Sequence, residues 1–108
     1  MDTDREDGKP FISQEDWAKS GAAFEAICQD LVKAMSQGAS PKSSEAQAVI
    51  RRHYEWLKRF WTPNRISYAG HSDLMLSSDL RKAYEKHDAE LPEFAATAMK
   101  EFAEQELA

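Results

Sequence analysis

The residues best suited to chemistry or recognition gather in one stretch of the chain, from Arg51 to Leu74. Its sequence, RRHYEWLKRFWTPNRISYAGHSDL, holds two histidines, five aromatic side chains and five basic side chains. A stretch of this kind could form a nucleic-acid surface, a catalytic site, a packed core or the wall of a ligand pocket. The spacing of its residues discriminates between these four interpretations.

The basic residues are predicted to lie on a solvated helix face rather than in a groove for nucleic acid. Residues at helical spacing form an inner stripe: Ala46, Ile50, His53, Leu57 and Phe60. Arg51, Arg52 and Lys58 lie off that stripe, where basic side chains are usually solvated. The whole chain carries 14 Lys and Arg against 19 Asp and Glu, a formal net charge of −5. We therefore expect no direct binding of nucleic acid by this chain.

The sequence shows no catalytic or metal-binding constellation. His53 has no Ser, Cys or acidic residue at a helical partner spacing on its own face, and the three histidines are scattered without an HExxH motif. The single cysteine, Cys28, can form neither an internal disulfide nor a CxxC-type zinc site. It falls on an apolar helical stripe, which is typical of a small buried hydrophobe. We expect no enzyme activity, no metal and no cofactor.

The aromatic residues are numerous enough to form both a core and the wall of a pocket. They number 11, or 10% of the chain. Any one of them is explained by core packing, but a set placed around a helix–turn–helix corner could line an apolar site with a few polar groups. His53 would offer a ring nitrogen, and the aromatic faces would stack on a ligand. The expected ligand-binding residues are His53, Trp56, Phe60, Trp61, Tyr68 and Met75.

Helices must position these side chains, because apolar residues recur every three or four positions and no alternating strand pattern is present. We predict an all-α fold of about five helices, in which the second and fifth are the long ones. Residues 1–10 are charged and contain Gly and Pro, so they are expected to form a disordered tail before a single domain at 11–108.

Capping residues mark the predicted helix boundaries. Ser13 would open the first helix and Gly38 would follow its end near Gln37. Ser44 and Gln47 have the spacing of a capping box for the second helix, which Pro63 would end near Trp61. A third helix is expected at 64–76, where Gly70 weakens it. Two short-range signals then place the last helices: Ser78 as the N-cap of the fourth and Pro92 in the first turn of the fifth.

The sequence also bears on the cellular compartment. The N-terminus is acidic and polar without an apolar segment, so no signal peptide is expected. No apolar run is long enough to span a membrane. A single cysteine fits a reducing environment. A soluble cytoplasmic protein is the expectation.

Two runs, RRHYEWLKRFWTPNRISYAG and LRKAYEKHDAELPEFAATAMKEFA, resemble the TipAS family of antibiotic-recognition domains. The similarity extends from about Trp17 to the C-terminus and rests on the order and spacing of several residues, among them the pair His53 and Trp56, then Tyr68 and Tyr84. The resemblance implies a globin-like all-α fold with a deep cleft. It further implies that the cleft takes up large, flat, heterocycle-rich antibiotics such as thiopeptides, and that the first helices close over them.

The resemblance implies one of two biological settings. The domain would be the drug-sensing effector half of a MerR-type transcriptional regulator, with a fused or separate DNA-binding domain, or a stand-alone drug-sequestering protein. The turn after the second helix reads WTPNR and has no thiol, so reversible rather than covalent capture is expected. The alternative from another class is a helical interaction or dimerisation module without a small-molecule ligand.

Overall fold

The computed structural model describes residues 14–108, with side chains described from Lys19 onward. The elements in chain order are α1 (Gln14–Ser36), α2 (Ser44–Leu57), α3 (Arg65–Ser77), α4 (Leu80–Glu85) and α5 (Leu91–Glu106). No strand occurs in this part of the chain, so the predicted all-α class with about five helices is confirmed. The expected tail at 1–10 and the expected Ser13 cap lie outside the described residues.

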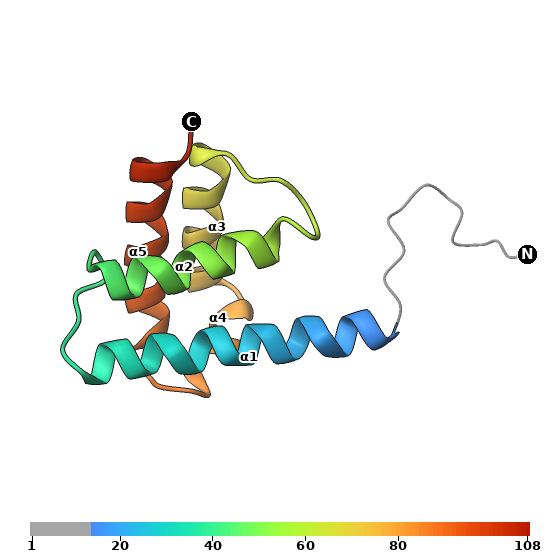
Figure 1. Ribbon diagram of the computed structural model, residues 1–108, viewed down its shortest axis with the longest axis horizontal. Coiled ribbons are helices and arrows are strands. Elements are labelled where there is room, and N and C mark those ends of the chain that lie inside the picture. Colours follow the sequence, from blue (N-terminus) through green and yellow to red (C-terminus); the bar gives the residue numbers. More distant parts are fainter. Residues whose placement is uncertain (1–13) are drawn as a thin grey trace, which may run out of the picture.

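The helices form two antiparallel pairs that cross each other. α1 packs along α2, and α3 packs along α5, with the second pair running across the first (Figure 1). The short α4 contacts both α3 and α5. None of the described helices combines the length and the hydropathy that crossing a membrane would require. The crossing brings α1, α3 and α4 around one end of α2, where the candidate site lies.

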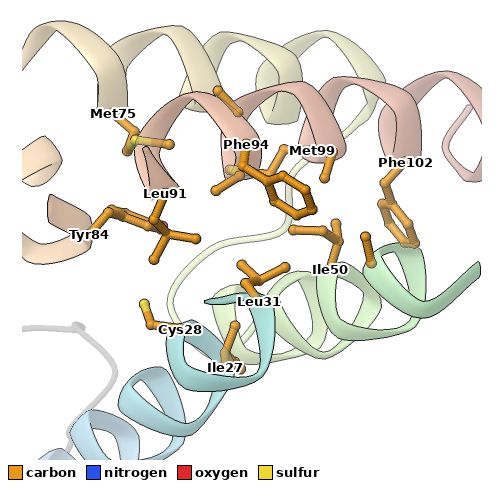
Figure 2. Close-up of a cluster of buried hydrophobic side chains, with 14 of the residues drawn as sticks. Ile27, Cys28, Leu31, Ile50, Met75, Tyr84, Leu91, Phe94, Met99 and Phe102 are labelled. Atoms are coloured by element: carbon orange, nitrogen blue, oxygen red, sulfur yellow. The ribbon is translucent and has the colours of Figure 1, made fainter. Parts of the chain in front are cut away.

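The core lies where the two pairs cross, and α5 is its centre. Nine of the 16 residues of α5 are buried. Four of them are alanines, which let the neighbouring helices approach closely: Ala95, Ala96, Ala98 and Ala103. Figure 2 shows Leu91, Phe94, Met99 and Phe102 of α5 facing side chains from the other helices. Burying these side chains is the main stabilising contribution to the fold.

The start of α2 differs from the predicted one. Ser43 is the N-cap, and its Oγ accepts a hydrogen bond from the backbone N–H of Ala46 at 3.2 Å. Gln47 does not reach back to close a capping box; its side chain donates to the carbonyls of Pro41 and Ala98. The predicted Ser44–Gln47 capping box is therefore wrong. Ser43 and Ser44 have the same capping chemistry, and the tertiary contact of Gln47 with α5 favours the earlier serine.

The relative lengths of the helices also differ from the prediction. α1, with 23 residues, is the longest, although α2 was expected to be a long helix. α2 ends at Leu57 rather than near Trp61, because the next residues form tight turns with N–H groups of Arg59 and Phe60 bonded three residues back. The N-cap of α4 is Asp79, one residue after the predicted Ser78. The Oγ of Ser78 still accepts a hydrogen bond from the backbone N–H of Leu80 at 3.3 Å.

Two helix ends and one position inside a helix agree with the sequence signals, and one capping feature was missed. Gly38 follows α1 with a φ of 83°, which lies in the left-handed region that favours glycine. Pro92 stands in the first turn of α5. Gly70 lies inside α3 as expected. The missed feature is a capping box at the start of α3, in which Asn64 Oδ1 accepts from Ser67 N–H and Ser67 Oγ accepts from Asn64 N–H, each at 2.8 Å.

Gly70→Ala is expected to raise the free energy of unfolding by about 0.5–1 kcal/mol. Gly70 is exposed within α3, and a Cβ at this position would meet no atom within 4 Å. The new methyl group therefore costs no packing, while alanine loses less conformational entropy than glycine on folding. Urea denaturation followed by circular dichroism measures the change. Gly38→Ala is the matched control, since its positive φ should make the same substitution destabilising.

Candidate functional site

An apolar cavity of about 350 Å³ lies between α1, α2, α3 and α4. The residues that line it are Ser20, Gly21, Phe24, His53, Trp56, Leu57, His71, Leu80, Ala83 and Tyr84. No Asp, Glu, Lys or Arg occurs among these lining residues of the described chain. Its volume falls at the lower end of the range for ligand pockets, about 300–1,000 Å³. An apolar wall with a few polar groups is the usual composition of a small-molecule site.

Three aromatic rings from three helices form the wall. The ring of Phe24 in α1 lies 5.3 Å from Trp56 in α2 and 5.2 Å edge-on from Tyr84 in α4, measured between centroids. Trp56 Nε1 donates to the backbone carbonyl of Ser20 at 2.9 Å. This bond satisfies the polar edge of the indole and fixes its orientation, so its faces remain available for apolar contact.

His53 lies at the buried side of the cavity between two tyrosines. Its Nδ1 is 2.7 Å from the hydroxyl of Tyr68, and its Nε2 is 3.3 Å from the hydroxyl of Tyr84. A neutral imidazole has one donor and one acceptor nitrogen, so one tyrosine donates to the ring and the other accepts from it. Burial, with a smaller contribution from His71, lowers the pKa of His53 to about 3. The ring is therefore uncharged at neutral pH.

Loss of stability in mild acid is the expected consequence of this burial. The folded-state pKa of about 3 lies below the ordinary value of 6.5, so the unfolded chain takes up the proton first. The contribution of neutral His53 is complete above about pH 6.5 and is lost progressively as the pH falls toward 3. We expect a loss of about 2 kcal/mol between about pH 7 and pH 5. Urea midpoints at both pH values measure it, and an equal loss in His53→Gln would contradict the assignment.

Four of the residues expected at a ligand site lie at or beside the cavity. His53 and Trp56 line it. Phe60 lies against Trp56, with centroids 5.2 Å apart, and Trp61 is 39% exposed with its ring 6.1 Å from His71. Whether these residues contact a ligand stays a prediction.

The other two expected site residues lie deeper. Tyr68 and Met75 are fully buried in the core and do not line the cavity. Tyr68 touches the site through its hydrogen bond to His53. Its hydroxyl is thus committed within the protein, and burial raises its pKa well above the ordinary value. Tyr68 therefore supports the wall from behind, and Met75 belongs to the hydrophobic core cluster.

Several lining residues were not among those expected from the sequence, because they come from helices outside the dense stretch. Ser20, Gly21 and Phe24 belong to α1, and Leu80 and Tyr84 belong to α4. Phe24 was recognisable as part of the apolar stripe of the first helix, but that stripe does not reveal which residues face a cavity. His71 lies within the dense stretch and lines the cavity as well, and burial lowers its pKa.

Cys28 is fully buried in the core, as its place on the apolar stripe predicted (Figure 2). Burial raises the pKa of its thiol to about 12, so the reactive thiolate is scarce near neutral pH. We expect iodoacetamide at about pH 8 to leave the folded protein unmodified and to label it once urea has unfolded it. Intact-mass spectrometry distinguishes the two outcomes. Rapid labelling of the folded protein would show that the thiol is accessible.

The basic residues of the dense stretch are exposed, as predicted. Arg51 pairs with Glu106 of α5 and Arg52 with Asp30 of α1, each at 2.6 Å between nitrogen and oxygen. Both pairs are solvent-exposed and link α2 to neighbouring helices, and exposed pairs of this kind contribute little to stability. No group of three His, Cys, Asp or Glu side chains within the described residues is arranged to hold a metal ion.

A second depression of about 380 Å³ lies between α2 and α5. Its border consists mainly of charged and amide side chains, including Lys42, Arg51 and Glu101. Such a surface competes poorly with water for an apolar ligand. The aromatic cavity is therefore the better candidate for small-molecule binding.

The chain is similar to known proteins over most of its length. Residues 11–102 match the TipAS antibiotic-recognition domain. Curated relatives are the HTH-type transcriptional regulators SkgA of two Caulobacter vibrioides strains, NA1000 / CB15N and ATCC 19089 / CIP 103742 / CB 15. Each is 31% identical over 104 residues, which cover 93% of this chain and 40% of the relative. The chain thus spans about two fifths of their length. No solved structure matches it, so the globin-like arrangement stays a prediction.

Proposed function

Because the chain belongs to the TipAS antibiotic-recognition domain family, we propose that it is a ligand-sensing domain that binds flat heteroaromatic molecules reversibly and without chemical reaction. The observation that carries this proposal is the cavity walled by Phe24, Trp56 and Tyr84, with no ionised side chain in its lining. Aromatic faces stack on flat rings, each pair contributing about 0.5–1.5 kcal/mol beyond burial of its area. Thiopeptide-like antibiotics are the ligand class that we propose.

The size of the cavity defines how such an antibiotic would bind. At about 350 Å³ it accommodates one flat ring system rather than a whole macrocycle. We propose that one heteroaromatic segment enters, while the rest of the molecule lies across the rim. Leu80 and Trp61 are partly exposed there, at 43% and 39%, and provide an apolar surface for the remainder. Because of this contact with the rim, a large antibiotic would bind with higher affinity than its isolated ring system.

Binding would connect helices that are far apart in the sequence. The lining residues come from α1, α2, α3 and α4, so a ligand that touches all of them stabilises their arrangement. The SkgA proteins are HTH-type transcriptional regulators. We propose that this chain serves as the effector domain of a MerR-type regulator, in which the ordering of α1 is passed to a DNA-binding half, or as a stand-alone drug-sequestering protein.

A titration with a soluble thiopeptide tests the proposal. Trp56 lines the cavity and Trp61 lies at its rim, so binding should change tryptophan emission in a saturable and reversible way. The difference between the wild type and Trp61→Phe gives the contribution of Trp61 to the change. Intact mass should show no covalent adduct, since the thiol of Cys28 is buried. Unchanged emission and unchanged melting temperature across a panel of flat antibiotics would argue against a ligand-sensing domain.

One surface feature favours the alternative function, a helical interaction module. Ile66 and Leu74 are 78% and 54% exposed and lie two turns apart on α3. Exposed apolar side chains on one side of a helix are typical of contact surfaces. Sedimentation analysis of the wild type and of Ile66→Lys with Leu74→Lys tests this: a dimer that the double variant abolishes, together with no response to ligands, favours the module.

A further inference from the structure

Ser20 has a buried hydroxyl without a partner beside the cavity. The residue lines the cavity and is 2% exposed, and its Oγ has no hydrogen-bond partner among the described residues. Its backbone carbonyl, by contrast, accepts the Trp56 indole N–H at 2.9 Å. Buried hydroxyl groups are nearly always hydrogen-bonded, so an unpartnered one next to a cavity points to a group that is supplied from outside the chain.

The other polar atoms of the wall are largely committed within the protein. Both nitrogens of His53 face tyrosine hydroxyls, one of them from Tyr84. The indole N–H of Trp56 is bonded to Ser20. The ring of His71 lies 6.1 Å from the rings of His53 and Trp61, and burial lowers its pKa, which favours the neutral form. Ser20 is therefore the lining hydroxyl of the described chain with neither its donor nor its acceptor positions in use, whereas the Tyr84 hydroxyl already shares a hydrogen bond with His53.

We infer that Ser20 selects the ligand: the cavity takes an uncharged, planar aromatic molecule that presents a hydrogen-bond acceptor, such as a ring carbonyl, to the Ser20 hydroxyl. This inference rests on the proposed function and narrows its ligand class. The hydroxyl reorients through a single χ1 torsion, so it can meet the acceptor without movement of α1. A cation is disfavoured, because no carboxylate lines the cavity to offset its loss of hydration.

Three probes, each built from three fused rings, test the need for an acceptor and the need for an uncharged ligand separately. Acridone is neutral and has a carbonyl acceptor and a ring N–H, anthracene is neutral and has neither, and proflavine is a cation near neutral pH, so the Ser20→Ala variant is needed to assign a preference to the carbonyl. Each is titrated in the same low concentration of dimethyl sulfoxide, with tryptophan emission as the signal. We expect the wild type to bind acridone about three- to tenfold more tightly than anthracene, the effect of one hydrogen bond, and to bind proflavine more weakly than acridone.

Ser20→Ala should abolish the preference for acridone and leave the affinity for anthracene unchanged. The backbone carbonyl that holds Trp56 is retained in this variant, so the wall stays in place. Ser72→Ala is the matched control, because that buried hydroxyl donates to the Ala69 carbonyl away from the cavity. Melting temperatures of both variants confirm folding.

The outcomes that overturn the inference differ from those that overturn the proposed function. A preference for acridone that survives in Ser20→Ala, or proflavine binding as tight as acridone binding, overturns the inference and leaves a ligand-sensing cavity in place. Absence of binding for all three probes to the wild type overturns both. A preference that is lost in Ser20→Ala and kept in Ser72→Ala supports the inference.

Discussion

His53→Ala is expected to lower the free energy of unfolding by about 3–5 kcal/mol. The ring is 2% exposed, and its removal leaves a void in the packed interior. It also leaves the hydroxyls of Tyr68 and Tyr84 without the nitrogen partners that they have at 2.7 and 3.3 Å. Urea denaturation at neutral pH measures the loss. A variant within about 1 kcal/mol of the wild type would show that this contact contributes little to stability.

Tyr68→Phe is the control that separates the hydrogen bond from the void. It keeps the ring in place and removes only the hydroxyl bonded to His53, so the expected loss is about 1–3 kcal/mol. The sequence suggested a ring nitrogen offered to a ligand, whereas both nitrogens face tyrosines. A weaker affinity in His53→Ala therefore has to be corrected for unfolded protein.

Gly21→Leu is expected to weaken ligand binding at least about tenfold while the protein stays folded. Gly21 lines the cavity, and a Cβ there would meet no atom within 4 Å. The larger side chain can therefore occupy space that a ligand needs, and leucine favours the helix more than glycine does. Titration with acridone and a parallel thermal melt give both quantities.

Two substitutions control for the change of residue type at Gly21. Gly21→Ala adds one methyl group and should weaken binding less than leucine does. Gly70→Leu makes the same exchange in α3, at a position that does not line the cavity, and should leave affinity unchanged. Equal affinities in Gly21→Leu and the wild type would show that ligands bind elsewhere on the surface.

The helices were predictable from the sequence because their apolar periodicity reports burial directly. The ends of the helices were harder to predict. Ser43 and Ser44 can both cap a helix, and the choice depends on the contact of Gln47 with the carbonyl of Ala98, 51 residues away in the sequence. α2 stops at Leu57 because its last turn tightens before Pro63 imposes a limit. Such details depend on tertiary contacts and on local hydrogen bonds that periodicity does not encode.

The candidate site was predictable only where it lies on a single helix. His53 and Trp56 are three residues apart, so their common face follows from helical geometry. Phe24 and Tyr84 join them through the packing of α1 and α4, which no spacing in the sequence reveals. Ser20 was missed for another reason: a lone serine in a helix has no recognisable pattern, and only the structure shows that its hydroxyl is buried and unpartnered.

We propose that flat, uncharged aromatic molecules bind in the cavity between α1, α2, α3 and α4. Intermolecular nuclear Overhauser effects between acridone and the isotopically labelled protein test it most directly. We predict contacts from the acridone ring protons to Phe24, Trp56 and Ala83, which line the cavity. Contacts confined to the exposed side chains Ile66 and Leu74 of α3 would contradict it, because those residues lie outside the cavity.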